Sequence, residues 1–274
     1  MKRIQFLLVL LLSLSVMHSC TKDKENIDTT DTEQENNSND DSSGVDGKEG
    51  KDKEDEDQEA DNEQNIVYGN GIKADGYTYK TIVLSTGKEW MAENLRTTKF
   101  ANGDIIKNVT DQSEWKALKD TKGLEESAAW CYYDNNEEYN NPYGKLYNWY
   151  AVNDERNICP DGWHVATTEE WQELIEEAGG IIDAWGNLKA TGTDYWKSPN
   201  YLATNNIGFS AMPGGVRTSS KFDYITKHGF YWTANKSITG GHTFTTSYSL
   251  FTQTNMLTIY IFEYYGHSVR CVKN

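Results

Sequence analysis

Residues 21–65 are almost devoid of apolar side chains, and this limits where the chain can fold. They hold eighteen Asp and Glu against five Lys, and their apolar residues are Ile27, Val45 and Ala60. So polar a segment cannot bury enough apolar surface to offset the chain entropy lost on folding. We therefore predict a disordered acidic tether over residues 20–64 and a single folded domain over residues 65–274.

The negative charge of the chain is concentrated in this tether. Residues 21–65 carry a net charge of −13 and residues 66–274 carry −5, while Lys2 and Arg3 bring the total to −16. An acidic tether repels nucleic acid and anionic lipid head groups, so neither is an expected partner. Two interpretations stay open: a spacer that holds a domain away from a membrane, or a solvating tail whose length has no role.

The N-terminus has the pattern of a lipoprotein export signal. Lys2 and Arg3 precede an apolar run over residues 6–12, and the small residue Ser19 stands directly before Cys20. The apolar run is too short to span a bilayer stably. We predict a signal peptide over residues 1–19 and lipidation of Cys20. The membrane would then be a partner through this anchor, and residues 22–25 resemble acidic signals for export to the outer cell surface.

The folded part has the pattern of an α+β domain built from short antiparallel strands and long loops. Runs rich in β-branched and aromatic residues, separated by glycine-containing turns, predict strands. They cover residues 66–68, 77–84, 89–92, 230–233, 245–251, 257–262 and 268–272. Nine Trp and seventeen Tyr would supply most of the core.

One helix is well defined by the sequence. Trp171, Leu174, Ile175 and Ala178 follow one another at helical spacing, which predicts a helix over residues 168–178. Thr167 and Glu170 have capping-box spacing, and Gly179-Gly180 ends the pattern. A shorter helix is predicted over residues 113–118, with Ser113 as its cap.

Cys131, Cys159 and Cys271 remain in the exported domain once Cys20 is assigned to lipidation. An oxidising compartment permits a disulfide, and Cys159 and Cys271 both lie in turn-rich segments. We predict the Cys159–Cys271 pair, with Cys131 buried as a free thiol. The pair Cys131–Cys159 is the open alternative.

Five sequence blocks, taken together, resemble those of the Fibrobacter succinogenes major paralogous domain. They are Trp90–Thr98, Tyr143–Val152, Cys159–Val165, Gly208–Arg217 and Gly266–Val272. The resemblance implies an exported or surface lipoprotein and defines little about activity. The pattern formed by the third and the last blocks, around Cys159 and Cys271, is also remotely similar to the C-type lectin-like fold and to formylglycine-generating enzymes. That similarity implies a C-type lectin-like architecture and carries no activity with it.

The arginines of these blocks have a structural interpretation. Arg217 and Arg270 each follow a valine, and a planar guanidinium there can clamp loop carbonyls. Arg96 lies in a predicted turn beside Asn94, where it can bond carbonyls or pair with a carboxylate.

The usual signatures of catalytic and metal sites are missing from the sequence. The acidic run over residues 134–138 lacks EF-hand spacing, and the histidines lack zinc spacing. There is no Gly-x-Ser-x-Gly motif, and a buried Cys131 would be inert. We therefore expect no metal, no cofactor and no catalytic residues.

Glycan binding is the chemistry that the loops favour, because sugars stack on aromatic rings and bond amide side chains. The candidate residues are Trp185, Asn187, Tyr195, Trp196 and Tyr201. The leading hypothesis is thus a lipid-anchored, outer-membrane, surface-exposed binding module, without catalysis, for a glycan or a surface protein. An enzyme acting on envelope or extracellular polysaccharide and a structural envelope or adhesin component are the alternatives.

Overall fold

Two strands near the start of the domain, one from its middle and the last strand pair into a four-stranded antiparallel sheet, called the central sheet below. The computed structural model describes residues 66–120, 127–239, 242–253 and 257–274. The sheet has the order β3-β4-β14-β8, from strands Thr81–Val83, Glu89–Met91, Cys271–Lys273 and Trp163–Val165. The last strand of the chain, β14, therefore lies between two much earlier ones, with Val272 opposite both Trp90 and His164.

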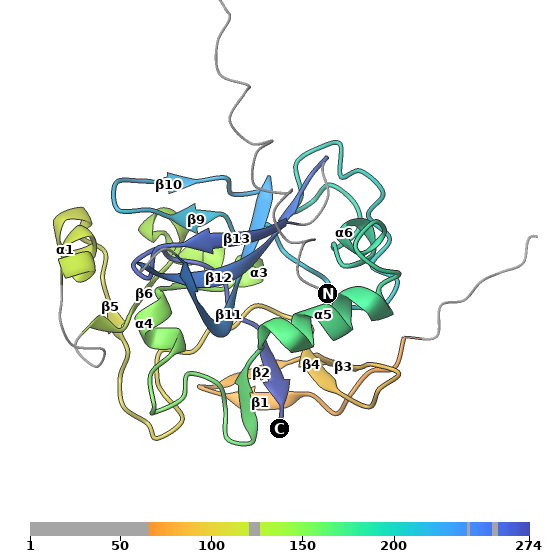
Figure 1. Ribbon diagram of the computed structural model, residues 1–274, viewed down its shortest axis with the longest axis horizontal. Coiled ribbons are helices and arrows are strands. Elements are labelled where there is room, and N and C mark those ends of the chain that lie inside the picture. Colours follow the sequence, from red (N-terminus) through yellow and green to blue (C-terminus); the bar gives the residue numbers. More distant parts are fainter. Residues whose placement is uncertain (1–65, 121–126, 240–241, 254–256) are drawn as a thin grey trace, which may run out of the picture. The chain divides into compact units, whose positions relative to one another are not determined.

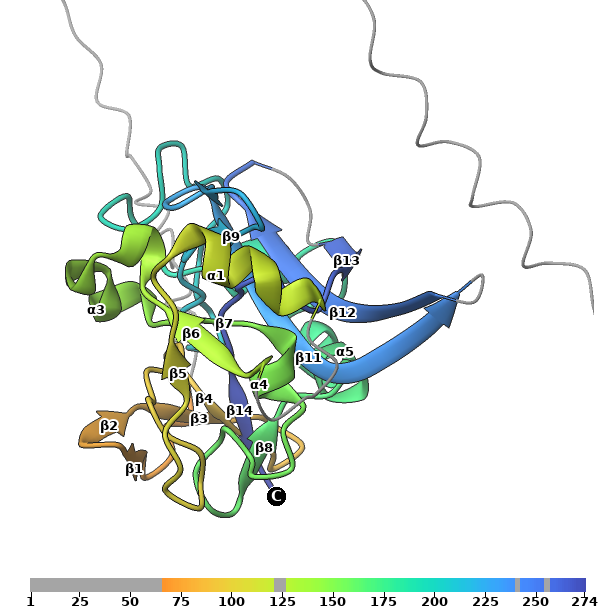
Figure 2. The ribbon, with the colours of Figure 1, turned by 90° about the vertical axis from the view of Figure 1, so that its left-hand side faces the viewer.

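A long hairpin forms the second sheet. Strands β11 (His228–Thr239) and β12 (His242–Phe251) pair antiparallel, and β13 (Leu257–Ile261) adds to β12. The hairpin curves outward beyond the other elements in Figure 2. The register shifts between Trp232 and Lys236, which marks a bulge that bends the strand. The sequence predicted residues 230–233 of β11 and 245–251 of β12. The parts of both strands nearer the hairpin turn were missed, because they lack the apolar alternation.

The remaining strands are short. A small sheet joins β5 (Lys107–Asn108), β6 (Ala129–Cys131) and β7 (Leu146–Tyr147), and its β5–β6 pair is parallel. Two further hairpins consist of β1 (Ile72–Ala74) with β2 (Tyr77–Tyr79) and of β9 (Val216–Arg217) with β10 (Phe222–Asp223). Mostly antiparallel strands with few helices confirm the predicted α+β class.

Only one helix among the described residues reaches ten residues. This is α5 (Thr168–Glu177), and its Thr167–Glu170 capping box is present as predicted. The other α-helices are α1 (Gln112–Ala117), α3 (Asn140–Tyr143), α4 (Trp149–Val152) and α6 (Ala184–Asn187). Single 3₁₀ turns are η1 (Leu118–Asp120), η2 (Tyr133–Asn135) and η3 (Glu137–Tyr139). No helix in the described part of the chain is long and apolar enough to cross a membrane.

Four sequence predictions about boundaries were wrong, and one of them is the strand over residues 268–272, which begins only at Cys271. The cap of α1 is Asp111 and not Ser113, because the Asp111 carboxylate accepts from the Glu114 amide. The predicted strand over residues 77–84 is divided at Lys80, because Tyr79 pairs with β1 while Thr81 pairs with β4. Of the predicted strand over 66–68, only Tyr68 forms a bridge, to Ile82.

The tryptophans are core residues, as the sequence predicted. All nine are buried, and they fall into three clusters. Trp171 of α5 stacks on Tyr248 of β12 with 5.0 Å between ring centroids and meets Trp90 of β4 edge-on at 5.4 Å. The helix thus joins the central sheet to the long hairpin, side by side with both in Figure 1.

The predicted disulfide is present. Cys159 and Cys271 are bonded, which attaches β14 to the loop before β8. Cys131 is free and buried, so the alternative pair Cys131–Cys159 is wrong. Burial raises the pKa of the Cys131 thiol to about 11, which keeps it protonated and unreactive at neutral pH.

Candidate functional site

The chain after β4 turns sharply and presents polar side chains beside a cavity. Leu95 is fully buried, its amide bonds the Val269 carbonyl, and its own carbonyl accepts from the Lys145 amide. The next amide, that of Arg96, donates to the Tyr79 hydroxyl at 2.9 Å. These bonds fix the backbone between Glu93 and Arg96 from both sides.

We call the hollow at this turn the Arg96 cavity. Its volume is about 430 Å³. Segments far apart in the sequence line it: Tyr68, Lys80, Ala92, Glu93, Arg96, Asn141, Pro142, Tyr195, Gly208, Ser210 and Met212. Because the lining combines a carboxylate, two cations, an amide and two exposed tyrosines, it offers both hydrogen-bonding groups and apolar ring faces.

Arg96 is buried but only loosely bonded. Its guanidinium lies 4.1 Å from the centroid of the Tyr77 ring. Its Nη2 is 3.5 Å from Asn141 Oδ1, 3.5 Å from the Pro142 carbonyl and 3.6 Å from Glu93 Oε1. Among the described residues, none accepts a hydrogen bond from its Nε. Contacts this long are weak, so much of the bonding capacity of the guanidinium is unused.

Glu93 is held firmly on the same side of the cavity. One carboxylate oxygen accepts from the Tyr77 hydroxyl and the other from the Lys80 amide, both at 2.7 Å. Burial, together with the hydrogen bond to Glu93, raises the pKa of Tyr77. Tyr77 therefore positions both charged residues, since its ring packs against the Arg96 guanidinium and its hydroxyl donates to Glu93.

A row of tyrosines continues from the cavity. The ring centroids of Tyr195 and Tyr143 are 6.3 Å apart, those of Tyr143 and Tyr139 are 6.0 Å apart, and Tyr133 follows at 5.4 Å. The Tyr143 hydroxyl also donates to the Tyr195 carbonyl. Tyr195 is 38% exposed and Tyr68 is 63% exposed, so the cavity has accessible rings on its rim.

The predicted ligand-binding residues are separated by the fold. Tyr195 reaches the Arg96 cavity, whereas Trp196 is fully buried and its indole donates to the Ala211 carbonyl. Trp185 and Tyr201 stack on each other 6.2 Å apart, and Tyr201 is 56% exposed. Asn187 bonds the Ala178 carbonyl and the Thr204 hydroxyl, so both ends of its amide are engaged within the protein.

Lys189 accounts for the arrangement around Trp185 and Trp196. Its Nζ lies 4.7 Å from the centroid of the first ring and 5.4 Å from that of the second. It donates to the carbonyls of Tyr201, Phe251 and Thr252. Burial lowers the pKa of Lys189 to about 8. These two tryptophans therefore enclose a cation that ties a loop to the end of β12.

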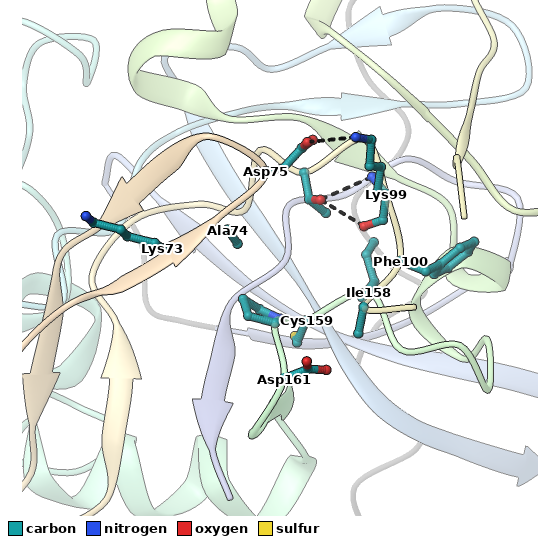
Figure 3. A pocket seen from close by; sticks show the side chains of 11 residues that line it. Lys73, Ala74, Asp75, Lys99, Phe100, Ile158, Cys159 and Asp161 are labelled. Carbon is teal, nitrogen blue, oxygen red and sulfur yellow. Dashed lines mark hydrogen bonds and ion pairs between the residues drawn. The ribbon is translucent and has the colours of Figure 1, made fainter. Parts of the chain in front are cut away.

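A second hollow lies beside the disulfide. It measures about 330 Å³, and Figure 3 shows Lys73, Asp75, Lys99 and Asp161 around it, with Cys159 in its wall. Asp75 accepts from the Thr98 amide at 2.7 Å and from the Thr98 hydroxyl at 2.6 Å, and it faces Lys99 Nζ at 3.9 Å. Asp75 and Lys99 pair with each other, and Lys73 and Asp161 are exposed, so among its described lining residues this hollow has no buried charged group with unused bonding capacity like that of Arg96.

The other two arginines of the sequence blocks, Arg217 and Arg270, are clamps, which confirms their predicted role. Arg270 donates to Asn94 Oδ1 and to the carbonyls of Met91, Phe209 and Ser210, at 2.8–3.0 Å. Arg217 donates to the Val109 carbonyl at 2.6 Å and to two neighbouring carbonyls. In the described part of the chain, no three His, Cys, Asp or Glu side chains are grouped as metal ligands.

Residues 83–273 match the family model described as the Fibrobacter succinogenes major domain. The chain belongs to this family. The Fibrobacter succinogenes major domain here includes Glu93, Arg96, Asn141 and Tyr195, whereas Tyr68 and Lys80 lie before the matched region. Searches of curated proteins and of solved structures returned no match. The likeness to C-type lectin-like folds therefore stays a prediction.

Sequence reasoning missed Glu93, Lys80 and Asn141 as site residues. The available signal was the position of Glu93 three residues before Arg96 in the first block of the Fibrobacter succinogenes major domain. Asn141 gave no comparable signal, because its approach to Arg96 depends on how the chain over residues 140–143 folds back onto the turn.

Proposed function

We propose that this protein is a surface-displayed binding module that takes an oligosaccharide in the Arg96 cavity. The loosely bonded, buried Arg96 guanidinium is the observation that carries the proposal. Buried polar groups are normally satisfied, and one that lines a cavity without strong partners is suited to bind a ligand. Asn141 and Glu93 add an amide and a carboxylate, which are common partners of sugar hydroxyls.

Accessible aromatic rings support a sugar ligand. Tyr195 and Tyr68 are exposed at the rim, and the tyrosine row leads away from it. An aromatic ring binds the apolar face of a pyranose ring at little conformational cost. A sugar bound at Arg96 could thus extend along the row.

The acidic groups favour binding over hydrolysis. Glycoside hydrolases use two carboxyl groups on opposite sides of the scissile bond. Among the described residues that line the Arg96 cavity, Glu93 is the single carboxylate, and both of its oxygens already accept short hydrogen bonds. That arrangement is suited to holding a ligand rather than to proton transfer.

The proposal includes a lipid anchor at Cys20 and display on the outer membrane. Cys20 and the acidic segment lie outside the described residues, and their support is the sequence pattern alone. Replacing Cys20 by Ala should move the protein from the membrane fraction to the soluble fraction. Unchanged partitioning of the Cys20→Ala variant would rule out the anchor.

Binding is tested with the full-length protein in detergent on an array of bacterial, plant and host glycans, followed by calorimetry. We expect Tyr195→Ala to weaken binding of any captured glycan at least fivefold. Tyr201→Ala is the matched control, because Tyr201 is also exposed but does not line the cavity. The proposal fails if no glycan is retained, or if Tyr201→Ala weakens binding while Tyr195→Ala does not.

A further inference from the structure

The charges of the Arg96 cavity indicate what kind of sugar it takes. Resting on the proposed function, we infer that the ligand is an acidic glycan whose uronic-acid carboxylate binds the Arg96 guanidinium. Three observations on the described residues lead to this inference: the bonding of Arg96, the bonding of Glu93 and the sign of the charge around the cavity.

Arg96 differs from the other two buried arginines in its contacts. Arg270 makes four hydrogen bonds of 2.8–3.0 Å, and Arg217 makes one of 2.6 Å. The polar contacts of the Arg96 guanidinium are 3.5–3.6 Å long. Arg96 is also only 6% exposed, so water does not easily replace the missing partners. A carboxylate is the group that meets a guanidinium best, because its two oxygens accept from two N–H groups at once.

Glu93 does not already fill this role. Its oxygens accept from the Tyr77 hydroxyl and the Lys80 amide at 2.7 Å, whereas Arg96 Nη2 is 3.6 Å away. The carboxylate is therefore turned toward other donors and forms only a loose ion pair with the guanidinium. It thus leaves N–H groups of the guanidinium for a second carboxylate.

The cavity is locally positive although the domain is acidic. Among the described residues, its lining has the cations Lys80 and Arg96 against the single anion Glu93. Residues 66–274 as a whole carry −5. A positive hollow on a negative domain selects an anionic group and repels it elsewhere on the surface. A neutral sugar would gain nothing from this charge.

The test compares acidic oligosaccharides with their own neutral forms. Oligogalacturonate, oligomannuronate and hyaluronan fragments are titrated into the full-length protein in detergent, before and after chemical reduction of their carboxyl groups to alcohols. At least one acidic form should bind tenfold or more tightly than its reduced form, and this preference should weaken as salt is raised. A poly-glutamate peptide serves as a non-sugar source of carboxylates.

Variants assign the preference to the cavity. Arg96→Gln should abolish the preference for the acidic form. Lys80→Gln changes an exposed lysine and should weaken the acidic form two- to fivefold, by more than it weakens the reduced form. Lys116→Gln removes an exposed lysine from α1, outside the cavity lining. It should change neither the binding of the acidic form nor the binding of the reduced form.

The outcomes separate this inference from the proposed function. Equal binding of acidic and reduced forms overturns the acidic ligand and leaves glycan binding in place. A preference that survives both Arg96→Gln and Lys80→Gln overturns the assignment to this cavity. Binding of poly-glutamate without binding of any oligosaccharide overturns both proposals, and so does the absence of binding altogether.

Discussion

Arg270 Nε donates to Asn94 Oδ1 at 2.8 Å, across 176 residues of sequence. The same guanidinium bonds the carbonyls of Phe209 and Ser210. Asn94 lies between Glu93 and Arg96 in the sequence, and Ser210 is itself a lining residue of the cavity. One fully buried arginine just before the last strand therefore holds two separate segments of the Arg96 cavity lining in position.

Replacing Arg270 should damage both stability and the cavity. Arg270→Met leaves four acceptors without their donor, three of them buried, so we expect a loss of roughly 3–5 kcal/mol in the free energy of unfolding. Urea denaturation followed by tryptophan fluorescence measures it. Arg270→Lys should also destabilise, because an ammonium group cannot reach the same acceptors in one plane. A loss below about 1 kcal/mol for Arg270→Met would contradict the clamp.

The disulfide should contribute strongly to stability. It closes a loop of 112 residues, for which the chain-entropy model gives about 4–5 kcal/mol. The double variant Cys159→Ala/Cys271→Ala should unfold at a clearly lower denaturant concentration than the wild type. Cys131→Ala, which removes the free thiol, is the control for the loss of a sulfur atom from the core. If reductant leaves the wild-type midpoint unchanged, the pairing is wrong.

Acid should destabilise the domain through His267. This ring is buried between Trp232 and Phe230, and burial lowers its pKa to about 3. Ser247 Oγ donates to the Tyr231 carbonyl and lies 2.9 Å from His267 Nδ1, so it accepts from a neutral ring protonated at Nδ1. The unfolded chain protonates histidine near pH 6.5. The stability that depends on a neutral His267 is therefore fully present above pH 6.5, and it is lost as the pH falls from 6.5 toward 3.

The size of this effect can be isolated with a variant. Between pH 7 and pH 5, the unfolding free energy of the wild type should fall by about 2 kcal/mol more than that of His267→Gln. Subtracting the variant removes the contributions of other groups, including His228, whose pKa burial lowers to about 4. Parallel pH profiles for the two proteins would show that His267 is not the responsible group.

The capping box of α5 provides a local prediction. Thr167 accepts from the Glu170 amide through its hydroxyl, and the Glu170 carboxylate accepts from the Thr167 amide at 2.9 Å. Thr167→Ala should cost about 1 kcal/mol of stability. Thr168→Ala, one residue further along, removes a hydroxyl of the same size from the helix itself and should cost less. Thermal or urea unfolding of the two variants makes the comparison, and equal losses would speak against the cap.

Local patterns were readable from the sequence, and long-range ones were not. The α5 cap, the strand at β4 and the burial of the tryptophans depend on spacing or residue type, so they could be predicted. The change of sheet at Lys80 depends on which strand pairs with β2 and which pairs with β3, and the hydrophobic periodicity of the segment does not specify these partners. Asp111 replaced Ser113 as a cap because both are good caps, and only the position of the helix in the fold decides between them.

The candidate site was harder to predict for the same reason. Tyr195 and Trp196 are adjacent in a polar loop, and the sequence treated them alike. In the fold, the first reaches the cavity rim and the second is buried against Ala211. The Arg96 cavity draws its lining from residues between 68 and 212, so no single segment of the sequence contains its pattern.

The place of β14 has a consequence for biogenesis. Its three residues fill the middle of the central sheet, between β4 and β8, and they come last along the described chain. Until the ribosome has released them, the two flanking strands lack their shared neighbour and Cys159 lacks its partner. The four-stranded sheet and the disulfide can therefore be completed only once β14 is available, so they form late in the maturation of the domain.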